Sequence, residues 1–252
     1  MKTLISALLV MAMFHLQAQN FIKHYFSECE WAIPNPPAPD PPVPVPTEMK
    51  FSCIIQKDYN LLIAGTQNDM ATPANYAIVL QEVDEFGGIV DIRTIFLEDP
   101  DVRVTPTGLI WESHASDEFV IICGYTGILS GTGANTPHAF VLKYNYVSHT
   151  VNWVTMYDEN QSEFFDIVAL DDGYLVCGEY YGSSDQDALF CSVDPTFGVL
   201  TPVLQIRAFT SDHAADTWYS MERKENYVFL TDRFEYYPDD GYERNEAWCY
   251  PV

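Results

Sequence analysis

Short apolar runs bounded by turn-forming residues recur along the chain and predict β-strands. The runs are rich in β-branched and aromatic types and end at Gly, Asp, Asn or Pro. No stretch carries the period of an amphipathic helix. Four of these runs resemble one another, and they lie at residues 59–65, 118–124, 173–178 and 226–231.

The four similar runs follow one another at a nearly constant spacing. Taking the last residue of each run, Gly65, Gly124, Gly178 and Thr231 are separated by 59, 54 and 53 residues. A second apolar run follows each first run and contains an alanine, at position 77, 139, 188 or 247. Similarity at one period indicates tandem structural units.

Each unit has room for four strands. Further candidate strands precede the paired runs, at residues 51–55, 109–112, 165–169 and 218–221, and others follow at 89–96, 151–157 and 199–207. Four antiparallel strands in each unit describe a β-propeller blade. A β-sandwich is the alternative, but it does not require internal similarity. We therefore predict an all-β propeller of about four blades, at about residues 51–97, 107–157, 163–207 and 217–252.

The fourth unit stops after its third strand, which leaves its edge unpaired. Residues 20–26 resemble the outer strand at 151–157, so we predict that this N-terminal strand completes the last blade. An incomplete propeller is the alternative. Between it and the first blade, residues 34–46 contain eight of the 16 prolines. This run is typical of a stiff polyproline II spacer, or of a ligand for a proline-binding module.

The first 18 residues are typical of a secretory signal peptide, with Lys2, an apolar stretch and Ala18 near the expected cleavage point. The mature chain would then be secreted or held in the cell envelope, in the periplasm or at the surface. Residues 19–50 would form the closing strand and linker, and 51–252 the propeller.

Export permits disulfide bonds, and all six cysteines lie after the leader. Cys177 and Cys191 face each other if the hairpin between them turns at Ser184. Cys29 and Cys53 flank the proline-rich run and could tie it down. Buried thiols are the alternative for both pairs.

The composition excludes some classes of function but does not identify one. Apolar residues make up 48% and charged residues 19%, which is enough for a large core. Twelve Lys and Arg against 36 Asp and Glu give a net charge of −24, which repels nucleic acid and anionic membrane surfaces. No metal or cofactor motif occurs; residues 183–187 or 238–241 offer at most a weak structural calcium site.

Three segments carry a resemblance to a known family. Residues 171–178, 187–198 and 139–144 resemble the repeats of secreted bacterial β-propeller proteins, with a D-G-G-Y-hydrophobic-G run, then D-A-F-hydrophobic-K-hydrophobic-D and a closing G-x-V-x-W. The resemblance covers about residues 51–250 and implies the architecture. It implies no catalytic motif, and the family is mostly uncharacterised. Thr231 departs from its pattern.

The loops that join strand two to strand three, and one blade to the next, share one end of a propeller, which we call the loop face. Aromatic rings and carboxylates on this face suit sugars. The candidate ligand-binding residues are Tyr125, Tyr180, Tyr181, Tyr236, Tyr237, Asp185 and Asp187. We therefore predict a non-catalytic binding or scaffold module for a glycan or protein. The oligomeric state is not indicated.

The alternative function is a carbohydrate-active enzyme that uses paired carboxylates. Asp166, Glu112 and Glu179 adjoin predicted strand ends and are the candidates for that chemistry. The sequence contains no serine nucleophile motif and no phosphate-binding loop.

Overall fold

The computed structural model describes residues 47–69, 76–97, 102–114, 117–128, 137–157, 161–181, 186–206, 215–235 and 243–251. Every element in these ranges is a β-strand. No helix in the described ranges is long and apolar enough to cross a membrane. The predicted signal peptide, closing strand and proline-rich run lie outside the described residues.

The strands form four consecutive sheets. Sheet 1 contains β1 (Thr47–Lys57), β2 (Asn60–Asp69), β3 (Tyr76–Val83) and β4 (Ile89–Ile95). Sheet 2 contains β5 (Val102–His114), β6 (Asp117–Ile128), β7 (His138–Asn145) and β8 (Thr150–Met156). Sheet 3 contains β9 (Gln161–Ala169), β10 (Tyr174–Tyr181), β11 (Gln186–Val193) and β12 (Leu200–Ile206). Sheet 4 contains β13 (Ala215–Lys224), β14 (Tyr227–Glu235) and β15 (Glu243–Pro251).

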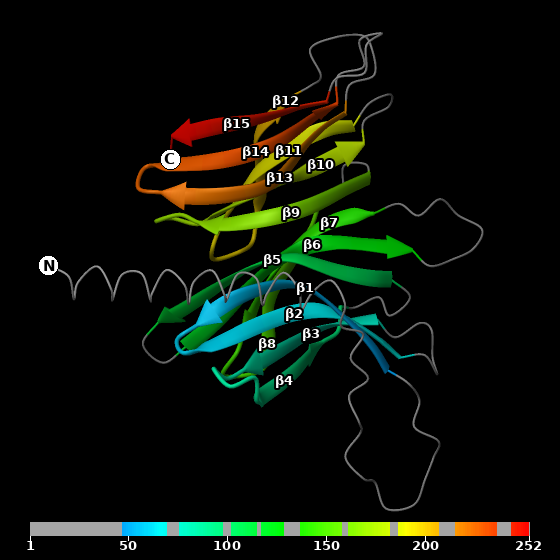
Figure 1. The fold of residues 1–252 in the computed structure, drawn as a ribbon, viewed down its shortest axis with the longest axis vertical. Helices are drawn as coiled ribbons and strands as arrows, with labels where there is room; N and C mark the ends of the chain where they lie inside the picture. The colour runs from blue at the N-terminus through cyan, green and yellow to red at the C-terminus, as the bar shows by residue number, and fades with distance from the viewer. Residues whose placement is uncertain are drawn as a thin grey trace, which may run out of the picture.

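The sheets have the organisation of β-propeller blades. Within each sheet the strands pair antiparallel in chain order. The first strands contact one another in series, β1 with β5, β5 with β9, and β9 with β13, so they are the inner strands. In Figure 1 sheet 1 lies at the bottom and sheet 4 at the top, with sheets 2 and 3 between them. The predicted all-β propeller with four blades is confirmed, and three strands of the fourth blade are described.

A β-bulge in the inner strand explains the repeated glycine. In three sheets one inner-strand residue is left unpaired next to the partner of that glycine. The bulged residues and the corresponding glycines are Ser52 and Gly65, Thr107 and Gly124, and Phe165 and Gly178. A Cβ atom on Gly178 would lie 1.9 Å from the Glu163 carbonyl oxygen. In these three sheets, glycine leaves room for the close approach of the inner strand.

Sheet 4 keeps the bulge but not the glycine. Tyr219 is the bulged residue of β13, between Trp218, which pairs with Asp232, and Ser220, which pairs with Thr231. Asp232 therefore occupies the glycine position, and the sequence alignment that placed Thr231 there is wrong by one residue.

Hydroxyl groups of bulged residues link the first three sheets. The Ser52 hydroxyl of β1 donates a hydrogen bond to the Pro106 carbonyl oxygen of β5. The Thr107 hydroxyl of β5 donates to the Phe164 carbonyl oxygen of β9 at 2.7 Å. The same repeat position thus joins sheet 1 to sheet 2 and sheet 2 to sheet 3.

The interface between sheets 3 and 4 is built differently, because the bulged residue Phe165 has no hydroxyl. The Asp166 carboxylate replaces that link and accepts hydrogen bonds from the Met221 N–H at 2.7 Å and the Ser220 hydroxyl at 3.1 Å. The Phe165 ring lies against the Tyr219 ring, with centroids 5.5 Å apart and planes tilted by 31°. Aromatic side chains therefore occupy both bulge positions at this interface.

The register of β10 and β11 contradicts the predicted disulfide between Cys177 and Cys191. Cys177 pairs with Phe190, and Cys191 pairs with Val176. The two cysteines therefore leave opposite faces of sheet 3, Cys191 toward the core shared with sheet 2 and Cys177 toward the core shared with sheet 4. Cys29 lies outside the described residues, so its pairing with Cys53 stays a prediction.

Candidate functional site

Two glutamates face each other across the first two strands of sheet 3. Glu163 of β9 is the direct ladder partner of Glu179 of β10. Directly opposed residues project from the same face of a sheet, with Cβ atoms about 4.5–5.5 Å apart. Cys177 lies two residues before Glu179 and is buried against sheet 4. Side chains alternate along a strand, so both carboxyls lie on the face toward sheet 4.

The acidic pair occurs in only one of the four repeats. The equivalent pairs, one position beyond the glycine or Asp232, are Lys50 and Thr66, Thr105 and Tyr125, and Thr217 and Arg233. The blade architecture therefore does not require two acids at this position. The opposed pair of acids is a local departure from the other three repeats.

Burial and a neighbouring charge change the protonation of Glu163. Glu179 is 5% exposed, and Glu163 is half-buried. Burial, and then the negative charge of Glu179, raise the pKa of Glu163 from 4.5 to about 7. Glu163 therefore holds its proton in mildly acidic solution and loses it as the pH passes about 7.

Tyr181 supplies a hydroxyl donor to Glu179. The Tyr181 hydroxyl donates a hydrogen bond to the Glu179 Oε1 at 2.9 Å. Burial, followed by the charge of Glu179, raises the pKa of Tyr181, so this hydroxyl stays protonated and remains a donor. The site therefore combines the two carboxyls with a phenol donor that contacts one of them.

The aromatic pair between sheets 3 and 4 lies beside the two acids. Phe165 is two residues after Glu163 in β9 and contacts the Tyr219 ring. Tyr219 is 45% exposed. The site therefore combines two carboxyls, a phenol donor and a solvent-accessible aromatic ring.

The site lies at the loop face. Glu163 is near the start of β9, which follows the connection from sheet 2, and Glu179 is near the end of β10, before the connection to β11. Tyr181, one of the predicted ligand-binding residues, is part of it.

Other predicted ligand-binding residues lie elsewhere. Tyr180 and Asp187 are ladder partners on the opposite face of sheet 3 and are 8% and 7% exposed. Tyr125 is half-buried in sheet 2, at the repeat position of Glu179. The remaining three, Tyr236, Tyr237 and Asp185, lie outside the described residues.

Two of the three acids nominated for catalysis have structural partners. Asp166 binds β13 through its two hydrogen bonds. Glu112 lies near the end of β5, away from the loop face, and pairs with Lys143 at 3.2 Å. Only Glu179 belongs to the site described above.

Sequence reasoning missed Glu163. The signal that identifies Glu163 is the pairing register of β9 with β10. Residues 163 and 179 oppose each other only when the bulge at Phe165 is included.

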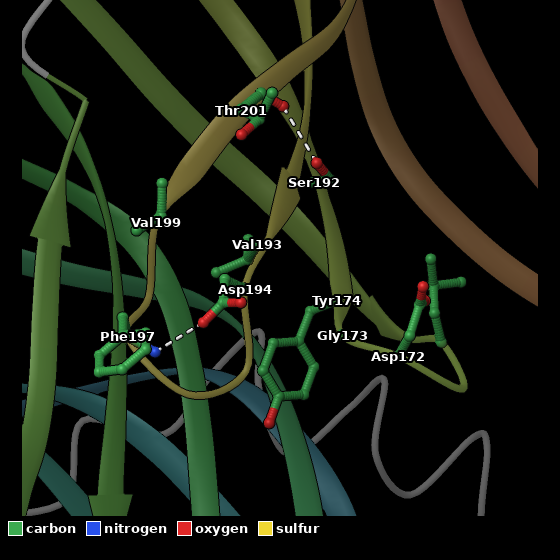
Figure 2. Close-up of a pocket in the computed structure, with 10 residues that line it drawn as sticks. Asp172, Gly173, Tyr174, Ser192, Val193, Asp194, Phe197, Val199 and Thr201 are labelled. Carbon is green, nitrogen blue, oxygen red and sulfur yellow. Dashed lines mark hydrogen bonds between the residues drawn. The ribbon is translucent and has the colours of Figure 1, made fainter.

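A separate cavity of about 450 Å³ opens at the opposite end of sheet 3 (Figure 2). It lies between the β9–β10 and β11–β12 turns, with Phe197 and Val199 on one side and Asp172 on the other. The Asp194 carboxylate accepts a hydrogen bond from the Phe197 N–H at 2.7 Å, which shapes the second turn. The strands of sheet 3 separate this cavity from the glutamate pair.

Within the described ranges, no three His, Cys, Asp or Glu side chains gather in a way that could hold a metal ion. The two segments named as weak calcium sites lie largely outside those ranges.

Comparison with known proteins identifies remote structural likeness only. No family model matches the chain, and no curated protein matches it. Solved structures similar to it include the polysaccharide lyase Uly1, with a TM-score of 0.48 and 8% identity over 81% of this chain and 46% of that one. A glycoside hydrolase matches with a TM-score of 0.47 and 9% identity over 83% of this chain and 72% of that one.

An exo-1,5-α-L-arabinanase from a bovine ruminal metagenomic library matches with a TM-score of 0.39 and 7% identity, over 81% of this chain and 74% of the arabinanase. The chain spans about half the length of the lyase. At these scores the likeness carries no information on chemistry.

Proposed function

We propose that the protein is a carbohydrate-active enzyme that cleaves glycosidic bonds by acid–base catalysis with Glu163 and Glu179. The observation that carries the proposal is the opposition of these two acids in one ladder, where the repeat requires none. A pair of carboxyls with separated protonation states is the chemical requirement for glycoside hydrolysis.

The two acids take different roles. Glu163, whose pKa of about 7 keeps it largely protonated in mildly acidic solution, donates its proton to the departing glycosidic oxygen. Glu179, which accepts the hydrogen bond of the Tyr181 hydroxyl, attacks the anomeric carbon as a nucleophile. Water, deprotonated by Glu163, then hydrolyses the glycosyl–enzyme ester. Directly opposed side chains start from neighbouring positions on one face, as a retaining enzyme with two nearby carboxyls requires.

The test incubates the protein with a panel of plant and microbial polysaccharides and measures the reducing ends that hydrolysis releases. Wild type should release sugar, and Glu179→Gln and Glu163→Gln should each lower kcat on the order of 10²–10⁴-fold. Glu222→Gln, an exposed acid on β13, is the matched control and should keep full activity.

Two results would contradict the enzyme proposal. One is release by Glu179→Gln at the wild-type rate. The other is binding of a polysaccharide without any turnover by wild type, which favours the non-catalytic binding module.

A further inference from the structure

We infer that Tyr219 and Phe165 form a sugar-stacking platform beside the two glutamates, and that the site takes a neutral glycan rather than a polyuronate. The inference rests on the proposed function for its location, but its aromatic and charge arguments are independent of catalysis.

The residue at the bulge position differs between the first two sheets and the last two. Bulge residues in sheets 1 and 2 are Ser52 and Thr107, whose hydroxyls fasten the neighbouring inner strand. At the equivalent positions in sheets 3 and 4 the fastening hydrogen bond from the bulge residue is replaced by a contact between the Phe165 and Tyr219 rings. Asp166 supplies the link between these sheets instead. The Phe165 and Tyr219 rings are therefore not needed for the hydrogen-bonded link between sheets that Ser52 and Thr107 make.

The Tyr219 ring is accessible to a ligand. It is 45% exposed and lies beside Glu163, which is half-buried. The Phe165 ring supports one side of it at 5.5 Å. A supported, accessible ring offers a flat apolar surface, which the C–H face of a sugar ring matches, while nearby carboxylates accept hydrogen bonds from sugar hydroxyls.

The charge around the platform is negative. Glu163 and Glu179 place up to two negative charges beside it, and the chain as a whole has a net charge of −24. Like charges repel, so these acids disfavour a polyuronate.

The experiment measures binding with Glu179→Gln as the background, so that turnover does not interfere. Isothermal titration calorimetry is performed with neutral hexasaccharides of glucose, xylose and arabinose, and with hexagalacturonate. We expect at least one neutral hexasaccharide to bind and hexagalacturonate not to bind. Added Tyr219→Ala should weaken neutral binding about tenfold, the loss of roughly 1.4 kcal/mol.

Two further variants separate stacking from folding. Tyr219→Phe keeps the ring and should bind like the parent. Phe197→Ala removes an exposed ring at the opposite end of sheet 3 and should also leave binding unchanged. In the active background, Tyr219→Ala should raise KM and leave kcat nearly constant, because a stacking contact binds ground state and transition state alike.

The outcomes test the stacking platform and the neutral class of glycan separately. Neutral binding that survives Tyr219→Ala overturns the platform, and tighter binding of hexagalacturonate overturns the neutral class. Absence of binding by every probe overturns both. Neutral binding that depends on Tyr219, in a wild-type protein that cleaves nothing, supports the platform and refutes the enzyme.

Discussion

Glu163 and Glu179 are direct partners in an antiparallel ladder, and both carboxyls face the neighbouring sheet. This relationship turns one of four similar blades into a chemically distinct one. It also makes the stability of the protein sensitive to pH in a way that can be measured without a substrate.

Folding stability should fall as pH rises from about 4.5 to above 7. The pKa of Glu163 is about 7 in the folded protein, above the ordinary 4.5. The folded state therefore holds a proton that the unfolded state releases, so this contribution is complete below about pH 4.5 and is lost as pH passes about 7. Thermal melts of wild type and Glu163→Gln across this range measure it.

The difference between the two melting curves isolates Glu163 from other acids, including Asp166, whose pKa burial also raises. The wild type should lose more stability than Glu163→Gln as pH rises. Parallel pH profiles for both proteins would show that the carboxyl does not carry a raised pKa.

Gly178→Ala should destabilise the protein by about 1–3 kcal/mol, the usual cost of forcing an extra carbon into a packed site. The added Cβ would meet the Glu163 carbonyl oxygen at 1.9 Å. Urea unfolding at constant pH gives the change in free energy. Gly127→Ala is the matched control, because its Cβ would have no heavy atom within 4 Å. Equal stability of both variants would remove the bulge explanation of the glycine repeat.

Native thiol labelling should distinguish one cysteine from three others. Cys249 is exposed, whereas burial raises the pKa of Cys53 to about 12 and raises the pKa values of Cys123 and Cys177. Iodoacetamide at pH 8 should modify Cys249 and leave these three unmodified until urea is added. Peptide mass spectrometry reads the sites.

The same spectra, taken without reduction, test the register. A peptide that links Cys177 to Cys191 would contradict the ladder between β10 and β11.

Deletion of residues 20–26 should lower the melting temperature sharply if this strand closes sheet 4. In the described ranges β15 pairs only with β14, so its other edge is available to a further strand. Deletion of residues 38–44, of the same length and within the proline-rich run, is the control and should have little effect. Similar melting temperatures for the two deletions would exclude the closing strand.

Much of the fold could be predicted because a local sequence pattern marks the strands of each blade. The apolar runs ending at Gly65, Gly124 and Gly178 mark the second strands, and their spacing gives the four sheets. The alignment at Thr231 is wrong because the fourth sheet lacks a glycine at its bulge, and Asp232 takes that place.

The site was harder to predict because it depends on pairing between strands. The apolar pattern suggests an inner strand beginning at Phe165, whereas β9 begins at Gln161 and includes Glu163. A single bulge places Glu163 rather than Phe164 opposite Glu179, and apolar periodicity does not encode bulges. The same dependence on register explains why Cys177 and Cys191 were expected to face each other.

The bulge of the inner strand is present in all four sheets, although its residue changes from Ser52 to Tyr219. Each sheet in such an array depends mainly on its immediate neighbours. A substitution at the bulge of one sheet therefore leaves the packing of more distant sheets unchanged. In this way one sheet of a repetitive scaffold can acquire a site that the other sheets lack.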